Sequence, residues 1–282
     1  MNKTISSATL SVEINSKGAE LIQIKQKNKN YIWDINTKFW NKTSPILFPI
    51  VGRLKNDTYN LDNNSYTLPR HGFARDYDFE VTTHQATEIE FLLTENDQTL
   101  QQFPFRFDLK LKYIVENNSL TLKYTIINKS EVVMPFSIGA HPAFSINIKE
   151  NNYHIEFDNN SELINHELEN ELFTGKSNTI PLKNKTLPLS YSLFEKDALV
   201  FKNISSRSLT IFENENPYLK IHLGTFPHLG IWTKPEAPFV CIEPWHGYAD
   251  STTTSRNIFN KEAIQKLTPN EKTDYYFTIE IL

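Results

Sequence analysis

The sequence predicts an all-β fold, a large antiparallel β-sandwich built from a single domain over residues 1–282. Short runs in which apolar and polar residues alternate fill most of the chain, as half-buried strands require. Asn-rich turn segments such as ENN, NNS and NEN separate these runs at intervals of about 8–20 residues. Long helical segments between the runs are missing, which argues against a parallel βαβ fold.

The first strand is expected at 9–14 (TLSVEI), where apolar residues occupy every second position and Thr, Ser and Glu fill the others. The same pattern places further strands, in chain order, at 20–25, 87–93, 107–115, 119–127, 153–157, 198–201, 208–212, 218–223, 239–243 and 275–282. One segment, SRNIFNKEAIQKL (255–267), has the spacing of a short helix. Asn/Lys-rich segments are expected to form polar loops at 28–30, 150–152, 158–170 and 183–186.

Composition excludes several classes of partner. The chain has 29 basic and 33 acidic residues, a net charge of −4, and no stretch basic enough to bind nucleic acid. No run approaches about 18 apolar residues, so no membrane span is expected. The single cysteine, Cys241, excludes an intrachain disulfide, and the N-terminal segment lacks the apolar core of a signal peptide, which favours a cytoplasmic protein. A homodimer formed through a sheet edge stays open.

Glycine and arginine are scarce, so their positions are informative. The chain has eight glycines, and Gly52, Gly72, Gly139 and Gly247 lie in the unusual segments PIVGR, RHGFAR, IGAHP and PWHGYAD, of which the last three contain a histidine. Glycine beside a polar side chain marks a sharp turn or the close approach of another group. Such segments are expected to border a site.

Arginines cluster early in the chain. Arg53, Arg70 and Arg75 are three of only six arginines, against 23 lysines. Arginine in a lysine-rich chain suggests planar hydrogen bonding to a ligand. The alternative is an internal ion pair with Asp57, Asp76 or Asp78, and both interpretations stay open.

His141 follows an apolar run, VVMPFSIG, that predicts a buried strand. Pro142 lacks a backbone donor and biases His141 toward an extended conformation, so His141 is expected at a strand end or bulge. It either faces a cavity and takes part in chemistry, or it is satisfied by a backbone partner.

Glu243 repeats this pattern, because the buried run FVCI leads into it and Pro244 is expected to close the strand. A carboxylate at such a position is costly unless it is hydrogen-bonded or used, and an ion pair with an arginine is the structural alternative. Trp245 either stacks on a ligand or packs, and His246 either contacts substrate or caps a turn.

An imidazole and a carboxyl group with ordinary pKa values near ~6.5 and ~4.3 form a plausible acid–base pair at neutral pH. The chain has no H-E-x-x-H segment, no cysteine pair, no dinucleotide-binding glycine motif and no G-x-S-x-G segment. The sequence therefore predicts neither metal nor cofactor, although a metal site assembled from distant strands stays open.

The segments HGFAR (71–75), IGAHPAF (138–144), IEPWHGYAD (242–250) and LTPNE (267–271) together resemble the aldose 1-epimerases of the galactose mutarotase superfamily, and among them the LacX-like bacterial branch. The resemblance spans nearly the whole chain. It implies a β-supersandwich fold and the interconversion of the α and β anomers of a free sugar, without metal or cofactor.

Site residues follow from this resemblance motif by motif. His141 resembles the general acid and Glu243 the general base. Residues similar to the family's substrate-binding side chains are Arg53, His71, Arg75 and Asp197. Family members that act on galactose have an Asn-His-x-Tyr-Phe motif where this chain has AHPAF, so galactose itself is not implied.

Three alternatives to a mutarotase of neutral sugars remain. The arginine cluster allows a substrate that bears a phosphate or carboxylate. A sugar-binding protein without catalysis would keep the fold but would not need a matched acid and base. A glycoside hydrolase would use two carboxylates, Glu243 with Asp250 or Asp197.

Overall fold

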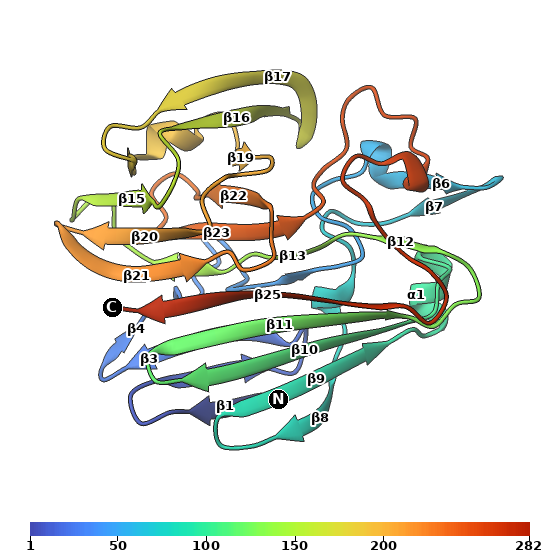
Figure 1. Ribbon diagram of the computed structural model, residues 1–282, viewed down its shortest axis with the longest axis horizontal. Helices are drawn as coiled ribbons and strands as arrows, with labels where there is room; N and C mark the ends of the chain where they lie inside the picture. Colours follow the sequence, from blue (N-terminus) through green and yellow to red (C-terminus); the bar gives the residue numbers. More distant parts are fainter.

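A computed structural model describes all 282 residues of the protein. Two large antiparallel sheets dominate it (Figure 1). The 9-stranded sheet has the order β18 (Thr186–Pro188), β15 (Tyr153–Phe157), β20 (Ser208–Glu213), β21 (Asn216–His222), β25 (Lys272–Ile281), β11 (Ser119–Asn128), β10 (Phe107–Glu116), β9 (Glu88–Thr94) and β8 (Glu80–His84).

The 8-stranded sheet has the order β17 (Leu172–Pro181), β16 (Glu162–Glu169), β19 (Leu199–Phe201), β22 (His228–Trp232), β23 (Phe239–His246), β13 (Ile138–Ala140) and β5 (Ile46–Leu47), and β14 (Ala143–Ser145) also pairs with β23. A 4-stranded sheet contains β1 (Asn2–Ser6), β2 (Ser11–Asn15), β3 (Glu20–Gln26) and β4 (Lys29–Asn30). Two-stranded pairs join β12 (Met134–Phe136) to β24 (Gln265–Leu267) and β6 (Thr58–Leu61) to β7 (Asn64–Thr67).

Helices are few and short. The single α-helix, α1, spans Asp97–Gln102 and begins with a capping box at Asn96, whose side chain accepts the N–H groups of Gln98 and Thr99. The 3₁₀ helices are η1 (Lys55–Asp57), η2 (Ala74–Asp76), η3 (Tyr191–Phe194) and η4 (Ile258–Asn260). None of these helices is long and apolar enough to cross a membrane.

Alternation along the strands gives each sheet its buried face. In β10 the side chains of Leu109, Leu111 and Tyr113 are buried, while Lys110 and Lys112 lie on the outer face, where Lys112 pairs with Glu88 at 2.9 Å. Period-two alternation of this kind buries one face of a strand and leaves the other in water.

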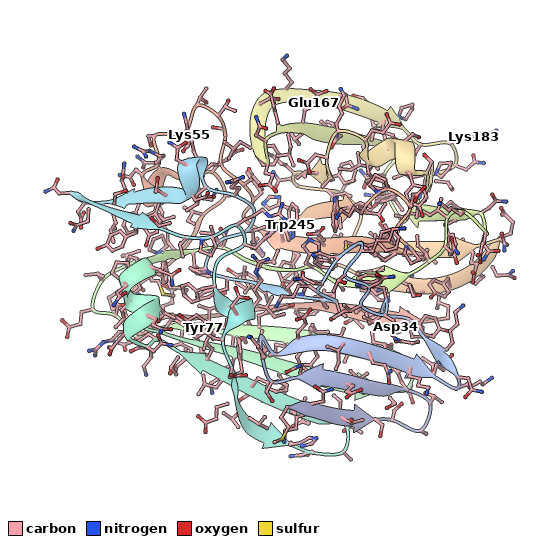
Figure 2. All side chains as sticks on the ribbon, turned by 180° about the vertical axis from the view of Figure 1, so that it is seen from behind. Asp34, Lys55, Tyr77, Glu167, Lys183 and Trp245 are labelled. Atoms are coloured by element: carbon pink, nitrogen blue, oxygen red, sulfur yellow. The ribbon has the colours of Figure 1, made fainter.

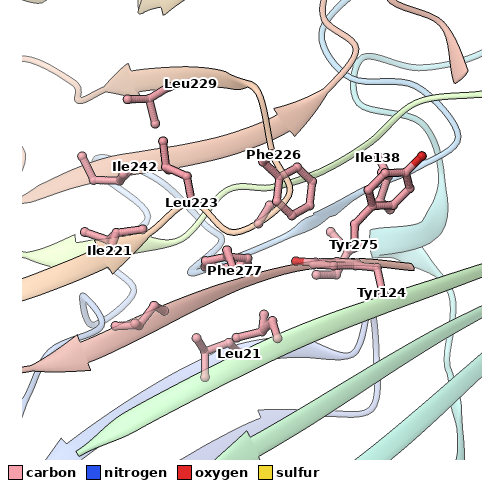
Figure 3. Close-up of a cluster of buried hydrophobic side chains, with 14 of the residues drawn as sticks. Leu21, Tyr124, Ile138, Ile221, Leu223, Phe226, Leu229, Ile242, Tyr275 and Phe277 are labelled. Atoms are coloured by element: carbon pink, nitrogen blue, oxygen red, sulfur yellow. The ribbon is translucent and has the colours of Figure 1, made fainter. Parts of the chain in front are cut away.

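The main core lies between the large sheets and extends to the 4-stranded sheet. It is a cluster of 66 buried side chains drawn from the whole chain, from Ile5 to Ile281. In Figure 3, Leu229 and Ile242 from the 8-stranded sheet lie above Tyr124 and Phe277 from the 9-stranded sheet, and Leu21 of β3 joins the same cluster. One core of this extent fits the sandwich predicted from the sequence.

The predicted strands are confirmed, each within a few residues of an observed strand. The helix predicted at 255–267 is wrong: only η4 forms there, and β24 follows it. Arg256 and Ala263 adopt positive φ angles of 64° and 57°, which a continuous helix does not allow. Leu267 instead pairs with Met134 in the register of β24 with β12.

The loop predicted at 158–170 is also wrong, because most of it forms β16. This strand and β17 make a hairpin at the edge of the 8-stranded sheet, which Figure 1 shows at the top of the molecule. Its side chains are mostly half-buried or exposed, so the hydrophobic alternation that identifies a strand in the sequence is weak.

Candidate active site

The two faces of β23 have different roles. Val240 and Ile242 point into the main core. Cys241, Glu243 and Trp245 alternate with them and therefore lie on the opposite face of the sheet. Figure 2 shows Trp245 near the centre of the molecule, below Glu167 of the β16–β17 hairpin in that view. This outer face of the sheet is the base of the candidate site.

His141 lies at an interruption in the strand next to β23. β13 ends at Ala140, β14 begins at Ala143, and both strands pair with β23. His141 Nε2 lies 3.2 Å from Glu243 Oε2. His141 is 7% exposed and Glu243 2%. The strand-end position predicted for His141 is confirmed, and the break in the sheet allows its ring to reach the carboxyl group.

The prediction that Pro244 closes the strand is wrong, since β23 continues to His246. Ile242 donates its N–H to Pro142 O at 3.2 Å, so the nitrogen of Pro244, two residues later, faces the same gap between β13 and β14. Proline lacks an N–H group, so a strand tolerates it where no carbonyl of the neighbouring strand faces its nitrogen. Glu243 is therefore held inside a strand, opposite Gly230 of β22.

Trp245 forms the floor of the site because two glycines leave space for its indole ring. A Cβ atom built on Gly139 of β13 would lie 2.6 Å from Trp245 Cδ1, and one on Gly230 of β22 would lie 2.5 Å from Cη2. The ring thus crosses the sheet over both glycines. Any larger residue at either position would lift the ring.

Aromatic rings surround the His141 imidazole. Trp40 lies 4.8 Å from it between ring centroids, Trp232 5.8 Å and His71 5.6 Å. Rings on several sides fix the orientation of the imidazole and exclude water from one side of it.

Backbone hydrogen bonds set the orientation of His71. His71 donates its N–H to Gly52 O at 2.9 Å, and Gly52 donates its N–H to His71 Nδ1 at 3.1 Å. Because Nδ1 accepts, the proton of the neutral ring is assigned to Nε2. Gly72 has φ +69°, and a Cβ atom there would collide with Phe48 O, so the turn that presents His71 requires this glycine.

A cavity opens above these groups. Its lining contains most of the residues singled out from the sequence: Arg53, His71, His141, Asp197 and Glu243. Arg75 is not part of the lining. Its guanidinium donates to Arg70 O at 2.8 Å, and Arg70 itself lines the cavity.

Sequence reasoning missed Trp40, Trp232 and Glu171, which also line the cavity. The chain has only four tryptophans, so their rarity was a signal for the first two. Glu171 gave no signal, because it lies in an Asn/Glu-rich stretch like many others.

The arginines of the cavity are paired with carboxylates. Arg53 donates from Nε and Nη2 to Asp57 at 2.9 and 2.8 Å, and from Nη1 to Glu171 Oε2 at 2.9 Å. Arg70 donates from Nη1 to Glu171 Oε1. The internal pair with Asp57 that the sequence left open is therefore present for Arg53.

Burial disfavours charge on both members of the His141–Glu243 pair. It raises the pKa of Glu243 well above its usual range, a shift that Asp197 reinforces and Arg70 opposes. It lowers the pKa of His141 to about 3, helped by Arg70 and Arg75. The 3.2 Å contact is therefore one between two neutral groups that share one transferable proton.

Other ionisable groups of the lining respond in the same way. Burial, with a contribution from His141, lowers the pKa of His71 well below its usual value, so this ring is neutral. Burial also raises the pKa of Asp197, although the Ala198 backbone N–H opposes that shift. Two lining atoms, His141 Nδ1 and Trp245 Nε1, are buried without a hydrogen-bond partner.

The side chains that could hold a metal ion are His141, Cys241 and Glu243, whose ligand atoms lie within 4.8 Å of one another. Cys241 is fully buried, and burial raises the pKa of its thiol well above the ordinary value. The donor set therefore consists of three neutral groups, two of which, His141 and Glu243, already contact each other. Nothing in this arrangement requires a metal.

Asp250 and His246 lie outside the cavity lining. Asp250 is buried, accepts from Lys261 Nζ at 2.8 Å and from the Lys55 N–H at 3.0 Å, and so fixes the loop that follows Arg53. It is not placed to act with Glu243 as a second hydrolytic carboxylate. His246 contacts Thr225 O through Nε2 at 2.9 Å and packs on Tyr275, on the core side of β23.

Known proteins resemble this chain over nearly its full length. The pattern of the family described as aldose 1-epimerase matches residues 2–258. The chromosomal LacX protein of Lactococcus lactis subsp. lactis is 30% identical, over 97% of this chain and 97% of LacX. A galactose mutarotase related enzyme from Lactobacillus acidophilus superposes with a TM-score of 0.95 at 30% identity, covering 100% of this chain and 97% of its own.

A galactose mutarotase-like protein from Lactobacillus casei ATCC 334 also superposes with a TM-score of 0.95, at 28% identity and over 100% of both chains. These matches agree with the antiparallel sandwich. The chain therefore belongs to the aldose 1-epimerase family and has its galactose mutarotase-like fold.

Proposed function

We propose that the protein is an aldose 1-epimerase that interconverts the α and β anomers of a free hexose by opening and closing the sugar ring. The observation that carries this proposal is the 3.2 Å contact between His141 Nε2 and Glu243 Oε2 at the base of a cavity lined by polar and aromatic side chains. Family membership supports the same reaction class.

Ring opening requires that one proton leaves the sugar and another enters it. The shared proton first moves from Glu243 to His141 across their contact. The carboxylate then accepts the proton of the C1 hydroxyl while the imidazolium donates to the ring oxygen, and the C1–O5 bond breaks. The open-chain aldehyde forms above a neutral acid and a neutral imidazole, the protonation state that burial favours.

Ring closure reverses these transfers. After rotation about C1–C2, the O5 hydroxyl attacks the other face of the aldehyde and returns its proton to His141, while Glu243 protonates O1. No proton is gained or lost overall, and no cofactor participates in the balance. The surrounding tryptophans limit access of water to the exposed aldehyde.

The remaining lining residues would hold the sugar hydroxyls during rotation. His71 offers a neutral Nε2–H donor and Asp197 an acceptor. Such positioning keeps the loosened chain near the acid–base pair. Arg53 already donates from Nε, Nη1 and Nη2 to Asp57 and Glu171, so it contributes less to binding the sugar than His71 and Asp197 do.

The test is NMR exchange spectroscopy with the purified protein and a panel of free hexoses. We expect the α–β exchange rate of at least one hexose to rise in proportion to protein concentration. A sugar-binding protein without catalysis would perturb the spectra but leave the exchange rates at their uncatalysed values, and that result would overturn the proposal.

A further inference from the structure

Glu171 bridges both arginines at the rim of the cavity. Its Oε2 accepts from Arg53 Nη1 at 2.9 Å, and its Oε1 accepts from Arg70 Nη1. Arg53 and Arg70 are the only Lys or Arg side chains in the lining. One carboxylate is thus shared between the only full positive charges of the cavity.

The β16–β17 hairpin holds Glu171 in this position. Asn170 and Glu171 form the tight turn, with positive φ angles of 52° and 66°. Just beyond the turn, Phe173 donates its N–H to Asp250 O at 2.9 Å and accepts from the Thr252 N–H at 2.9 Å. The turn is therefore anchored to the segment that follows β23, and Glu171 is part of the cavity wall.

Arg53 and Arg70 differ in the side-chain hydrogen bonds that each would keep if Glu171 no longer accepted from them. Arg53 donates from Nε and Nη2 to the Asp57 carboxylate, so the edge of its guanidinium that could hold a phosphate by two hydrogen bonds is already occupied. Arg70 has no side-chain acceptor other than Glu171. Its side chain is 47% exposed at the rim, and its guanidinium would then present a free fork of donors to the cavity. A free arginine fork is the usual receptor for phosphate or carboxylate.

We infer that Glu171 is a specificity-determining residue that restricts this site to uncharged sugars by occupying the arginines that would otherwise bind a sugar phosphate. A phosphate entering the cavity would have to displace the carboxylate from Arg70 and remain close to its negative charge. A neutral hydroxyl can accept from a remaining guanidinium N–H without breaking the bridge. The inference rests on the proposed anomerase function and names the substrate class of that site.

The experiment compares wild type with Glu171→Gln, which keeps the side-chain shape and removes the charge. NMR exchange gives kcat/KM for a hexose and for its 6-phosphate. We expect wild type to prefer the neutral hexose at least tenfold. We expect Glu171→Gln to shift the ratio toward the 6-phosphate by roughly ten- to a hundredfold, the size of one charge-assisted hydrogen bond. A ratio unchanged within twofold, or a wild type that prefers the phosphate, would overturn the inference.

Two further variants separate causes. Glu88→Gln removes an equal charge from a pair with Lys112 on the outer face of the 9-stranded sheet, and we expect it to leave the ratio unchanged. Glu171→Gln combined with Arg70→Met should lose the gain for the 6-phosphate, because Arg70 supplies the receptor. A gain that persists in the double variant, or that also appears in Glu88→Gln, would contradict the assignment.

A binding measurement keeps this inference distinct from the proposed function. In isothermal titration calorimetry with inorganic phosphate, Glu171→Gln should bind and wild type should not. If neither protein accelerates any anomer exchange but the calorimetric difference is present, the function fails and the role of Glu171 stands. If neither protein binds phosphate, the role of Glu171 is wrong, whatever the activity.

Discussion

The His141 imidazole and the Glu243 carboxyl form the one ionisable pair of the candidate cavity in which both side chains are buried, whereas the other deeply buried pair, Lys261–Asp250, lies outside that lining. Pairs such as Lys112–Glu88 lie in water and contribute little to stability. His141 and Glu243 are 9% and 2% exposed at their side chains, and no Lys or Arg side chain lies within ion-pair distance of either. Uncompensated burial of this kind is typical of residues kept for chemistry rather than for stability.

We therefore predict that His141→Asn and Glu243→Gln each lower kcat for anomer exchange by about 10²–10⁴-fold, the usual contribution of one positioned proton transfer. Both substitutions keep approximate shape and polarity, so the circular dichroism spectrum should stay that of wild type. Because each group needs the other, the double variant should be little slower than either single variant. Near wild-type exchange in either single variant would remove that residue from the mechanism.

Burial of Glu243 also has a consequence for stability. Its folded pKa lies above its unfolded value of about 4.3. The folded state therefore holds a proton that the unfolded state releases as pH rises, and stability falls between the unfolded pKa and the folded pKa. Glutamine does not titrate and still offers an N–H to His141 Nε2.

We predict that Glu243→Gln is more stable than wild type at pH 8 and that the difference shrinks as the pH falls toward 4.5. Thermal unfolding of both proteins across this range measures it. Glu88→Gln, which removes a partly exposed carboxylate outside the site, serves as the control. A constant difference between Glu243→Gln and wild type would mean that the carboxyl group is ionised in the folded protein.

At the scale of elements, the site depends on three adjacent strands that combine small and large residues. Gly139 of β13 and Gly230 of β22 flank Trp245 of β23, and the indole ring lies over both. Glu243 is opposite Gly230 in the same register. Strand pairing therefore fixes the floor of the cavity and the Glu243 carboxyl together.

We predict that Gly230→Ala destabilises the protein by about 1–3 kcal/mol, the usual cost of overpacking a fitted site. It should also reduce anomer exchange, because a Cβ atom 2.5 Å from Trp245 Cη2 forces the ring upward into the cavity. Urea unfolding and NMR exchange measure the two effects. Adding Trp245→Phe to Gly230→Ala should recover part of the stability, since the smaller ring leaves room. If the double variant is less stable than Gly230→Ala, steric contact with Trp245 is not the cause.

Elements were predictable from the sequence where one face is buried. β10 and β11 alternate over their full lengths because one side faces the core and the other faces water. β16 has no such contrast, and nothing local distinguishes it from a polar loop. At 255–267 the apolar spacing fits a helix, but Leu267 instead pairs with Met134 of β12, a strand that is distant in the sequence. Tertiary pairing of this kind overrides local periodicity.

The site was predictable where a residue has its own motif. His141 and Glu243 stand in unusual segments beside proline, and their family resemblance is specific. The ion pair between Glu171 and Arg53 joins residues more than a hundred positions apart in the chain. Arg70 lines the cavity where Arg75 was predicted, and the conformation of the turn that contains both residues decides which of them does so. Contacts set by topology leave no trace in local sequence.

At the scale of the molecule, the cavity collects residues from Trp40 to Ala249. No short segment contains the site, so it exists only when distant parts of the chain have come together around the 8-stranded sheet. Yet the main core of 66 residues contains none of the four tryptophans. Trp33, Trp40 and Trp232 lie in or against one small separate cluster, and Trp245 in another.

This separation allows a test of whether the protein folds as one unit. Tryptophan fluorescence reports on the site side of the 8-stranded sheet, whereas far-ultraviolet circular dichroism reports on all strands. Since β23 contributes Val240 and Ile242 to the main core and Glu243 and Trp245 to the site, neither face can unfold alone. We predict a single transition in urea, with coincident midpoints for the two signals.

A sugar that binds the site should raise both midpoints equally, by the free energy RT ln(1 + [L]/Kd), which is about 2.7 kcal/mol at a hundredfold excess over Kd. His141→Asn should retain most of this shift, because it removes a proton donor and leaves the rest of the cavity wall. The opposite result would be two separate unfolding midpoints, with the fluorescence signal lost at the lower urea concentration and only that transition shifted by sugar. It would show that the site face of the 8-stranded sheet unfolds at a lower free energy than the rest of the protein. In that case, binding would be coupled to ordering of the site face rather than to global folding.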